Sequence, residues 1–95
     1  MKMIIIQAVL TVKEGHEAAL REVVQDVVAP SRQESGCILY ALHESTENEG
    51  TFVFYEKWVD QEAFEAHVNS EHYLAYREKS AAHTLSRVVH RLKEL

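Results

Sequence analysis

The sequence predicts a small α+β domain whose elements follow one another in the order β-α-β-β-α-β. The chain has 95 residues, which is the length of one domain, and we expect residues 1–95 to form a single unit. Three segments rich in β-branched and aromatic residues are separated by turn residues, as strands are. Segments with the apolar spacing of helices follow the first and the third of them.

The first part of the chain predicts one strand and one helix. Residues 3–12 (MIIIQAVLTV) are aliphatic and β-branched, with neither glycine nor proline, and predict a strand. Residues 16–29 predict an amphipathic helix, with one apolar face formed by Leu20, Val23, Val24, Val27 and Val28. Pro30 either ends this helix or begins a further turn through Glu34, and Gly36 is the expected terminator.

A hairpin is predicted next. Residues 37–45 (CILYALHES) and 51–59 (TFVFYEKWV) have the composition of strands. The polar segment 46–50 between them closes with a glycine, as hairpin loops commonly do. The two strands are therefore expected to be antiparallel neighbours.

The last third of the chain predicts two short helices and a final strand. Asp60 is a natural N-cap for a helix through Val68, and Ser70 for a helix over 71–81. Residues 84–93 fit a fourth strand. The complete order is the split-βαβ or ferredoxin-like arrangement, an antiparallel sheet with helices on one face.

Both faces of this sheet are predicted to be apolar. The third strand carries Phe52, Phe54, Glu56 and Trp58 on one face, and Val53, Tyr55, Lys57 and Val59 on the other. Helices on one side leave the second face bare, and a large exposed apolar face is rare on a monomer. We therefore expect a homodimer with two-fold symmetry, in which the sheets pack together as a dimeric α+β barrel.

Composition excludes several classes of partner. The formal net charge is −5 and the basic residues are scattered, which argues against nucleic acid or an anionic membrane as a partner. No apolar stretch approaches the roughly 20 residues of a membrane span. The single cysteine, Cys37, cannot form an internal disulfide, so a reducing, cytoplasmic setting is expected.

Glu56 is the most unusual residue of the third strand, because it lies between Phe54 and Trp58 on one face. A carboxylate among aromatic rings needs a partner, access to solvent, or a raised pKa that keeps it protonated. One interpretation is a structural ion pair or hydrogen bond, for example with Arg32. The functional interpretation is a group that orients a ligand or tunes a neighbouring histidine.

Three histidines are expected to converge near Glu56, namely His43, His67 and His72. The spacing of His67 and His72 is not the i, i+4 spacing of a helical zinc motif, and Asn69-Ser70 breaks the helix between them. We therefore predict no metal site. Four aromatic side chains offer flat walls suited to an aromatic ligand, namely Tyr40, Trp58, Tyr73 and Tyr76. The alternative for each of them is packing in the core.

An ordered set of residues resembles a known family. The set is Ser31-Arg32-Gln33-Glu34-Ser35-Gly36-Cys37-Ile38-Leu39-Tyr40, Phe52-x-x-x-Glu56-x-Trp58, Ala63-Phe64-x-x-His67 and Ser70-x-His72-Tyr73. It is similar to the antibiotic biosynthesis monooxygenase domain, and closest to its small quinol-monooxygenase-like branch. The resemblance covers essentially the whole chain.

The resemblance implies a homodimer whose sheets pack face to face, with a pocket in each subunit between sheet and helices. It also implies that O2 oxidises a small quinol-like or polyphenolic compound without metal, flavin, haem or other cofactor. Deprotonation of such a substrate yields an anion able to reduce oxygen. The protein then needs a base, a dry pocket and hydrogen bonds that hold the anion.

Roles for individual residues follow from the same resemblance. His67 is the expected base, with His43 as the second candidate, since histidine titrates near neutral pH. Glu56 is expected to orient the base or hold a ligand hydroxyl. The expected ligand-binding residues are Trp58, Tyr40, His72 and Arg32, with Arg32 better suited to anchoring Glu34 or Glu56 than to touching substrate.

The resemblance argues against haem degradation and leaves two alternative functions. Haem-degrading members use an asparagine, a tryptophan and a histidine ligand where this chain has approximately Gln7, His67 and Arg77, so haem degradation is not expected. One alternative function is proton transfer on a sugar-derived signal, as in an autoinducer-processing isomerase. The other is a non-catalytic dimer of the stress-response type that only binds a small ligand.

Overall fold

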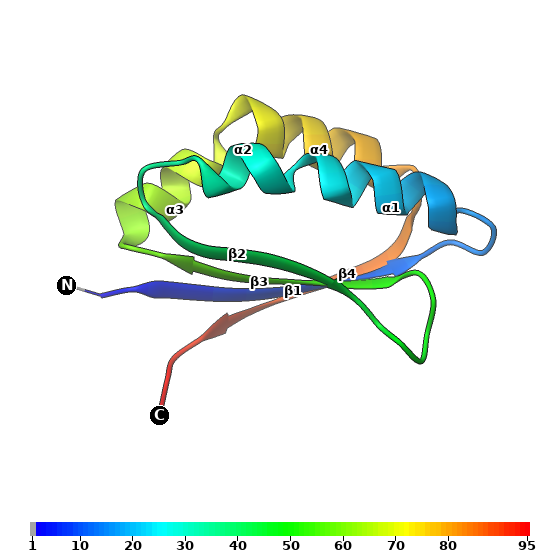
Figure 1. Cartoon of the computed structure of the whole chain (residues 1–95), viewed down its shortest axis with the longest axis horizontal. Coiled ribbons are helices and arrows are strands. Elements are labelled where there is room, and N and C mark those ends of the chain that lie inside the picture. The colour runs from blue at the N-terminus through cyan, green and yellow to red at the C-terminus, as the bar shows by residue number, and fades with distance from the viewer. Residues whose placement is uncertain (1) are drawn as a thin grey trace.

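The computed structural model describes residues 2–95 and confirms the ferredoxin-like fold. The strands form one antiparallel sheet in the order β2-β3-β1-β4, so β1 and β3 are central. Their bounds are β1 Ile4–Val12, β2 Cys37–Glu44, β3 Thr51–Trp58 and β4 Thr84–Leu92. All helices cover the same face of the sheet, and the other face is bare in the single chain (Figure 1).

The predicted first helix is divided in two, into α1 (Glu17–Asp26) and α2 (Val28–Arg32). The break falls at Val27, and α2 begins two residues before Pro30. Pro30 lies in the first turn of α2, where a backbone N–H has no partner within the helix, so the ring is tolerated there. Pro30 therefore permits the further turn and does not end the helical segment.

The two predicted N-caps are confirmed. Asp60 Oδ1 accepts a hydrogen bond from the backbone N–H of Ala63 at 2.8 Å and starts α3 (Gln61–Val68). Ser70 Oγ accepts one from the backbone N–H of Tyr73 at 3.2 Å and starts α4 (Glu71–Ala81). These caps place His67 in the last turn of α3 and His72 in the first turn of α4, on either side of a short link.

Gly36 has a different role from the helix terminator that the sequence suggests. A Cβ atom added at Gly36 would lie 2.2 Å from Cβ of Ala63 in α3, and the φ of Gly36 is not positive. The glycine is needed because the loop before β2 passes directly against α3. This close approach carries Glu34, two residues earlier, to the region of His67.

The core lies between the sheet and the helices. Its largest side chains are almost fully buried, and they include Leu10, Tyr40, Phe52, Phe54 and Trp58. The bare face carries partly exposed apolar side chains, among them Met3 (44%), Leu39 (38%), Val88 (49%) and Leu92 (41%). Both faces of the sheet are therefore apolar, as the sequence predicts.

Within the described residues, none of the helices has the length and apolar character needed to cross a membrane.

Candidate functional site

A small cavity lies between the sheet and the helices, where the sequence predicts a pocket. Its volume is about 30 Å³, and its polar lining groups are Tyr40, Glu56, His67, Tyr73, Tyr76 and Arg87. That space corresponds to roughly one water molecule. A quinol-sized ligand enters only if lining side chains move, and Phe64, Tyr73 and Arg87 are the aromatic and cationic ones that are partly exposed.

His67 is the central group of this cavity. Its side chain is fully buried, its ring stacks on Trp58 with 4.3 Å between centroids, and Nδ1 lies 2.7 Å from Oε2 of Glu34. Nε2 has no hydrogen-bond partner and lies 3.9 Å from Oε1 of Glu56. Burial lowers the pKa of His67, and Glu34 opposes this effect. The imidazole is therefore neutral near pH 7.

Glu56 is buried on β3 beside His67. It accepts a hydrogen bond of 3.0 Å from Trp58 Nε1, and burial raises the pKa of its carboxyl to about 7, which Trp58 and Arg87 partly oppose. The proposed ion pair with Arg32 is wrong, because Arg32 Nε donates to the backbone carbonyl of Tyr40 at 2.9 Å. The carboxyl of Glu56 therefore has both a raised pKa and a hydrogen-bond partner, which is the indole of Trp58.

Arg87 is a cationic group of the cavity that sequence reasoning missed. It lies on β4 opposite Leu10, and alternation places both on the helix-covered face. Its Nη2 donates to the hydroxyl of Tyr73 at 3.1 Å, while its Nε is buried without a partner. The inward position of Arg87 could have been found by applying the two-residue period to the fourth strand.

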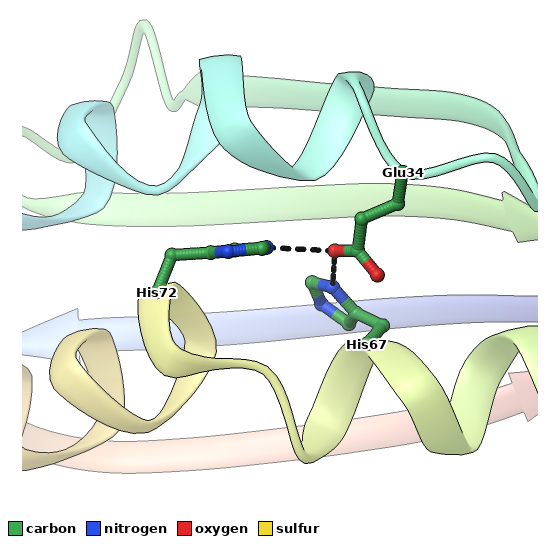
Figure 2. A group of neighbouring side chains, drawn as sticks. All are labelled: Glu34, His67 and His72. Carbon is green, nitrogen blue, oxygen red and sulfur yellow. Dashed lines mark hydrogen bonds and ion pairs between the residues drawn. The ribbon is translucent and has the colours of Figure 1, made fainter.

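Glu34 is the second missed residue. Its Oε2 lies 2.7 Å from Nδ1 of His67 and 2.7 Å from Nε2 of His72. Figure 2 shows the carboxylate reaching from the loop after α2 to both rings, which project from the ends of α3 and α4 that face each other. In the sequence Glu34 lies in a polar loop, and no local pattern marks it as a buried partner of either histidine.

His43 does not join this cluster, so the expected convergence of three histidines is wrong. The pairing of β2 with β3 shifts between Cys37 and Leu39, which places Tyr40 opposite Glu56 and His43 opposite Val53. Cys37 packs against the core, whereas Leu39 and His43 are exposed on the bare face. A bulge of this kind reverses the faces of all later residues in the strand.

Of the expected ligand-binding residues, one lines the cavity and the others lie outside its lining. Tyr40 lines the cavity, and its ring packs against His67 and Trp58. Trp58 is fully buried and lies behind His67, outside the lining. His72 and Arg32 also lie outside the lining, because each is engaged by a neighbouring segment.

The cluster of Glu34, His67 and His72 also has the composition of a metal site. One ligand atom from each residue lies within 4.8 Å of the others. Imidazole and carboxylate groups suit zinc or ferrous iron. The two 2.7 Å hydrogen bonds account for the close approach of these groups without an ion, and an ion would displace both of the shared protons.

A larger hollow lies elsewhere, at the end of the sheet. It has a volume of about 720 Å³ and is formed by the start of β1, the end of β4 and the start of α3. Its carboxylate, Asp60, is engaged in capping α3. It holds no histidine, so a group suited to acid-base chemistry near pH 7 is found in the small cavity instead.

Comparison with known proteins agrees with this architecture. The sequence profile described as "Antibiotic biosynthesis monooxygenase" matches residues 3–79. The chain belongs to the antibiotic biosynthesis monooxygenase family. Family membership and the fold are thus consistent with one another.

Individual relatives support the same assignment. "Putative monooxygenase YcnE" of Bacillus subtilis (strain 168) is 40% identical over 75 residues, which are 78% of each chain. The crystal structure of PA3566 from Pseudomonas aeruginosa has a TM-score of 0.95 and 33% identity, covering 100% of this chain and 96% of that one. Rv0793 from Mycobacterium tuberculosis has a TM-score of 0.92 and 28% identity, covering 99% and 96%.

Proposed function

We propose that this protein is a cofactor-independent monooxygenase that oxidises a small quinol-like or polyphenolic compound, with His67 as the base. The observation that carries the proposal is Nε2 of His67, a buried basic atom that has no hydrogen-bond partner among the described residues and belongs to a side chain lining the cavity. A lone imidazole nitrogen in a dry space is suited to taking a proton from a substrate hydroxyl. Family membership supports the same class of reaction.

Arg87 completes the proposed chemistry. Arg87 lines the same cavity, and its Nε, which has no partner among the described residues, can donate to the oxygen that becomes negative when the hydroxyl is deprotonated. The quinol anion then supplies the electrons to O2. A quinol and one O2 yield a hydroxyquinone and one water, so atoms and electrons balance without a further reductant.

The small volume of the cavity sets a condition on this function. Binding requires lining side chains to move outward and admit the ring, and the partly exposed aromatic and cationic ones, Phe64, Tyr73 and Arg87, are the candidates. Closure around the ring would then exclude water and strengthen every electrostatic contact with the anion. The proposal therefore includes a side-chain rearrangement on binding.

A homodimer in the cytoplasm is the proposed setting. The bare face carries exposed apolar side chains, which include Met3, Val88 and Leu92. A second copy of the chain would cover them. The free thiol of Cys37 suits a reducing compartment.

Oxygen consumption with menadiol as the quinol, corrected for autoxidation, tests the proposed activity. His67→Ala should lower the rate of the enzyme by about 10²–10⁴-fold, the usual contribution of a general base. His43→Ala should retain the rate, because that ring lies on the opposite face. Equal rates for wild type and His67→Ala would remove His67 from the mechanism.

The same assay separates the alternatives. A base beside an arginine also suits proton transfer without oxygen, as in an isomerase. Protein that binds menadione, as seen by tryptophan fluorescence, but consumes no oxygen above background would favour an isomerase or a binding protein over the oxygenase. Trp58 stacks on His67 and reports on the cavity as the only tryptophan of the chain.

A further inference from the structure

We propose that Glu34, held in place by His72, is the positioning residue that keeps the proton of His67 on Nδ1 and leaves Nε2 free to act as the base. This inference rests on the proposed function for the identity of the base. It gives the orienting role to a carboxylate in the loop after α2, whereas the sequence pointed to Glu56 on β3.

The hydrogen bonds of Glu34 determine where the protons lie. Its Oε2 is 2.7 Å from Nδ1 of His67 and 2.7 Å from Nε2 of His72. Dashed lines mark both contacts in Figure 2. An ionised carboxylate only accepts hydrogen bonds, so both ring nitrogens must be donors. A neutral His67 that carries its proton on Nδ1 has a lone pair on Nε2, the atom that faces Glu56 and the cavity.

Glu56 cannot take this role in the structure. Its nearest oxygen is 3.9 Å from Nε2 of His67, which is too far for a hydrogen bond. The same oxygen already accepts a hydrogen bond from Trp58 Nε1. A carboxyl that donated a hydrogen bond to Nε2 would also occupy the lone pair that the base must offer to substrate.

His72 explains why the carboxylate stays in place. The Glu34 side chain is 17% exposed and comes from a loop, so a single contact would leave it free to rotate toward solvent. His72 donates to the same oxygen from the first turn of α4, which Ser70 fixes by capping. Three chain segments thus converge on one oxygen, and His72 becomes a positioning residue and not a ligand contact.

A carboxylate on the far nitrogen of an imidazole is a general way to fix the tautomer and raise the basicity of the ring. Here the arrangement opposes the effect of burial, which favours the neutral ring. The pair therefore supplies an imidazole that is neutral in the resting state and still gains a stabilising partner when it accepts a proton.

Histidine tautomers can be measured directly in the full-length protein. In two-bond ¹H–¹⁵N correlation spectra of ¹⁵N-histidine-labelled protein at pH 8, wild-type His67 should carry its proton on Nδ1. Glu34→Gln should move the proton at least partly to Nε2, because the new amide can donate to Nδ1. Loss of the negative charge should also lower kcat/KM for menadiol by about 10–100-fold.

Two matched variants test the specificity of the effect. Glu62→Gln removes a carboxylate that borders the same surface hollow as Glu34, and it should leave the tautomer on Nδ1. Glu56→Gln should also leave it there. A wild-type proton on Nε2, or a tautomer that changes with Glu56→Gln and not with Glu34→Gln, would overturn the proposal.

His72 gives a second route that does not depend on the stability of Glu34→Gln. His72→Ala should lower kcat/KM, and His72→Gln, whose amide N–H can still donate to Glu34, should restore part of it. If neither change affects the tautomer or the rate, His72 has no positioning role. If His67 has the expected tautomer but His67→Ala consumes oxygen normally, the positioning pair stands and the proposed function fails.

Discussion

The two faces of the sheet have similar apolar composition and different surroundings. On β3, Phe52 and Phe54 point to the helices and are 2% and 1% exposed, whereas Val53 and Tyr55 on the other face are only half-buried. The helix-covered face also gathers the polar groups Glu56, His67 and Arg87 around one cavity. The comparison indicates that the covered face holds the candidate site, while the other face is bare in the single chain.

The largest expected effect tests the packing of the covered face. Phe54→Ala should lower the free energy of unfolding by about 3–5 kcal/mol, because it removes a fully buried ring and leaves a void. Tyr55→Ala, one residue away on the bare face, should cost much less at low protein concentration. Urea unfolding at sub-micromolar concentration measures both, and equal losses would contradict the division between the faces.

The second prediction concerns the buried carboxyl on the covered face. The pKa of Glu56 is about 7 in the folded protein, against 4.5 for an ordinary glutamate. A raised pKa gives stability that is fully present below pH 4.5 and is lost as the pH rises through about 7. Between pH 4 and pH 8, wild type should therefore lose about 3 kcal/mol relative to Glu56→Gln in denaturant titrations.

Glu44 provides a control of opposite sign for this pH experiment. Its hydrogen bond with Arg21 lowers the pKa of the Glu44 carboxyl to about 2. A lowered pKa gives stability that is present above pH 4.5 and is lost as the pH falls toward 2. Glu44→Gln should thus be less stable than wild type at pH 7 and approach it in acid. The same slope for both variants would refute the assignment for Glu56.

The smallest expected effect concerns the bare face. Val88 lies opposite Val9, on the bare side of the edge strand β4, and is 49% exposed in the single chain. Val88→Asp should weaken the proposed dimer by about 2 kcal/mol, which is roughly 30-fold in its dissociation constant. Leu74→Asp, at an exposed position of α4, is the matched control. A wild type that sediments as a monomer at micromolar concentration would remove the dimer.

The fold was predictable because local signals agree with one another. The β-branched and aromatic composition gave the strands, and the caps at Asp60 and Ser70 gave the starts of α3 and α4 to the residue. The break at Val27 and the packing role of Gly36 were not predicted. The role of Gly36 depends on its contact with Ala63, a residue of a distant segment.

The candidate site was predicted in part, for a related reason. His67 and Glu56 were identified because a polar residue among apolar ones on a strand or helix face is visible in the sequence. His43 was placed wrongly because the bulge after Cys37 leaves no clear local signal. Arg87 was missed because its inward direction on β4 was not considered.

The sequence by itself determined the order of elements, the two apolar faces of the sheet and the need to satisfy Glu56. Only the tertiary structure decided that Glu34 joins His67 to His72, and that the cavity is about 30 Å³. The reason is physical. Periodicity and capping act over a few residues, whereas a hydrogen bond between side chains 33 positions apart exists only after the helices have packed on the sheet.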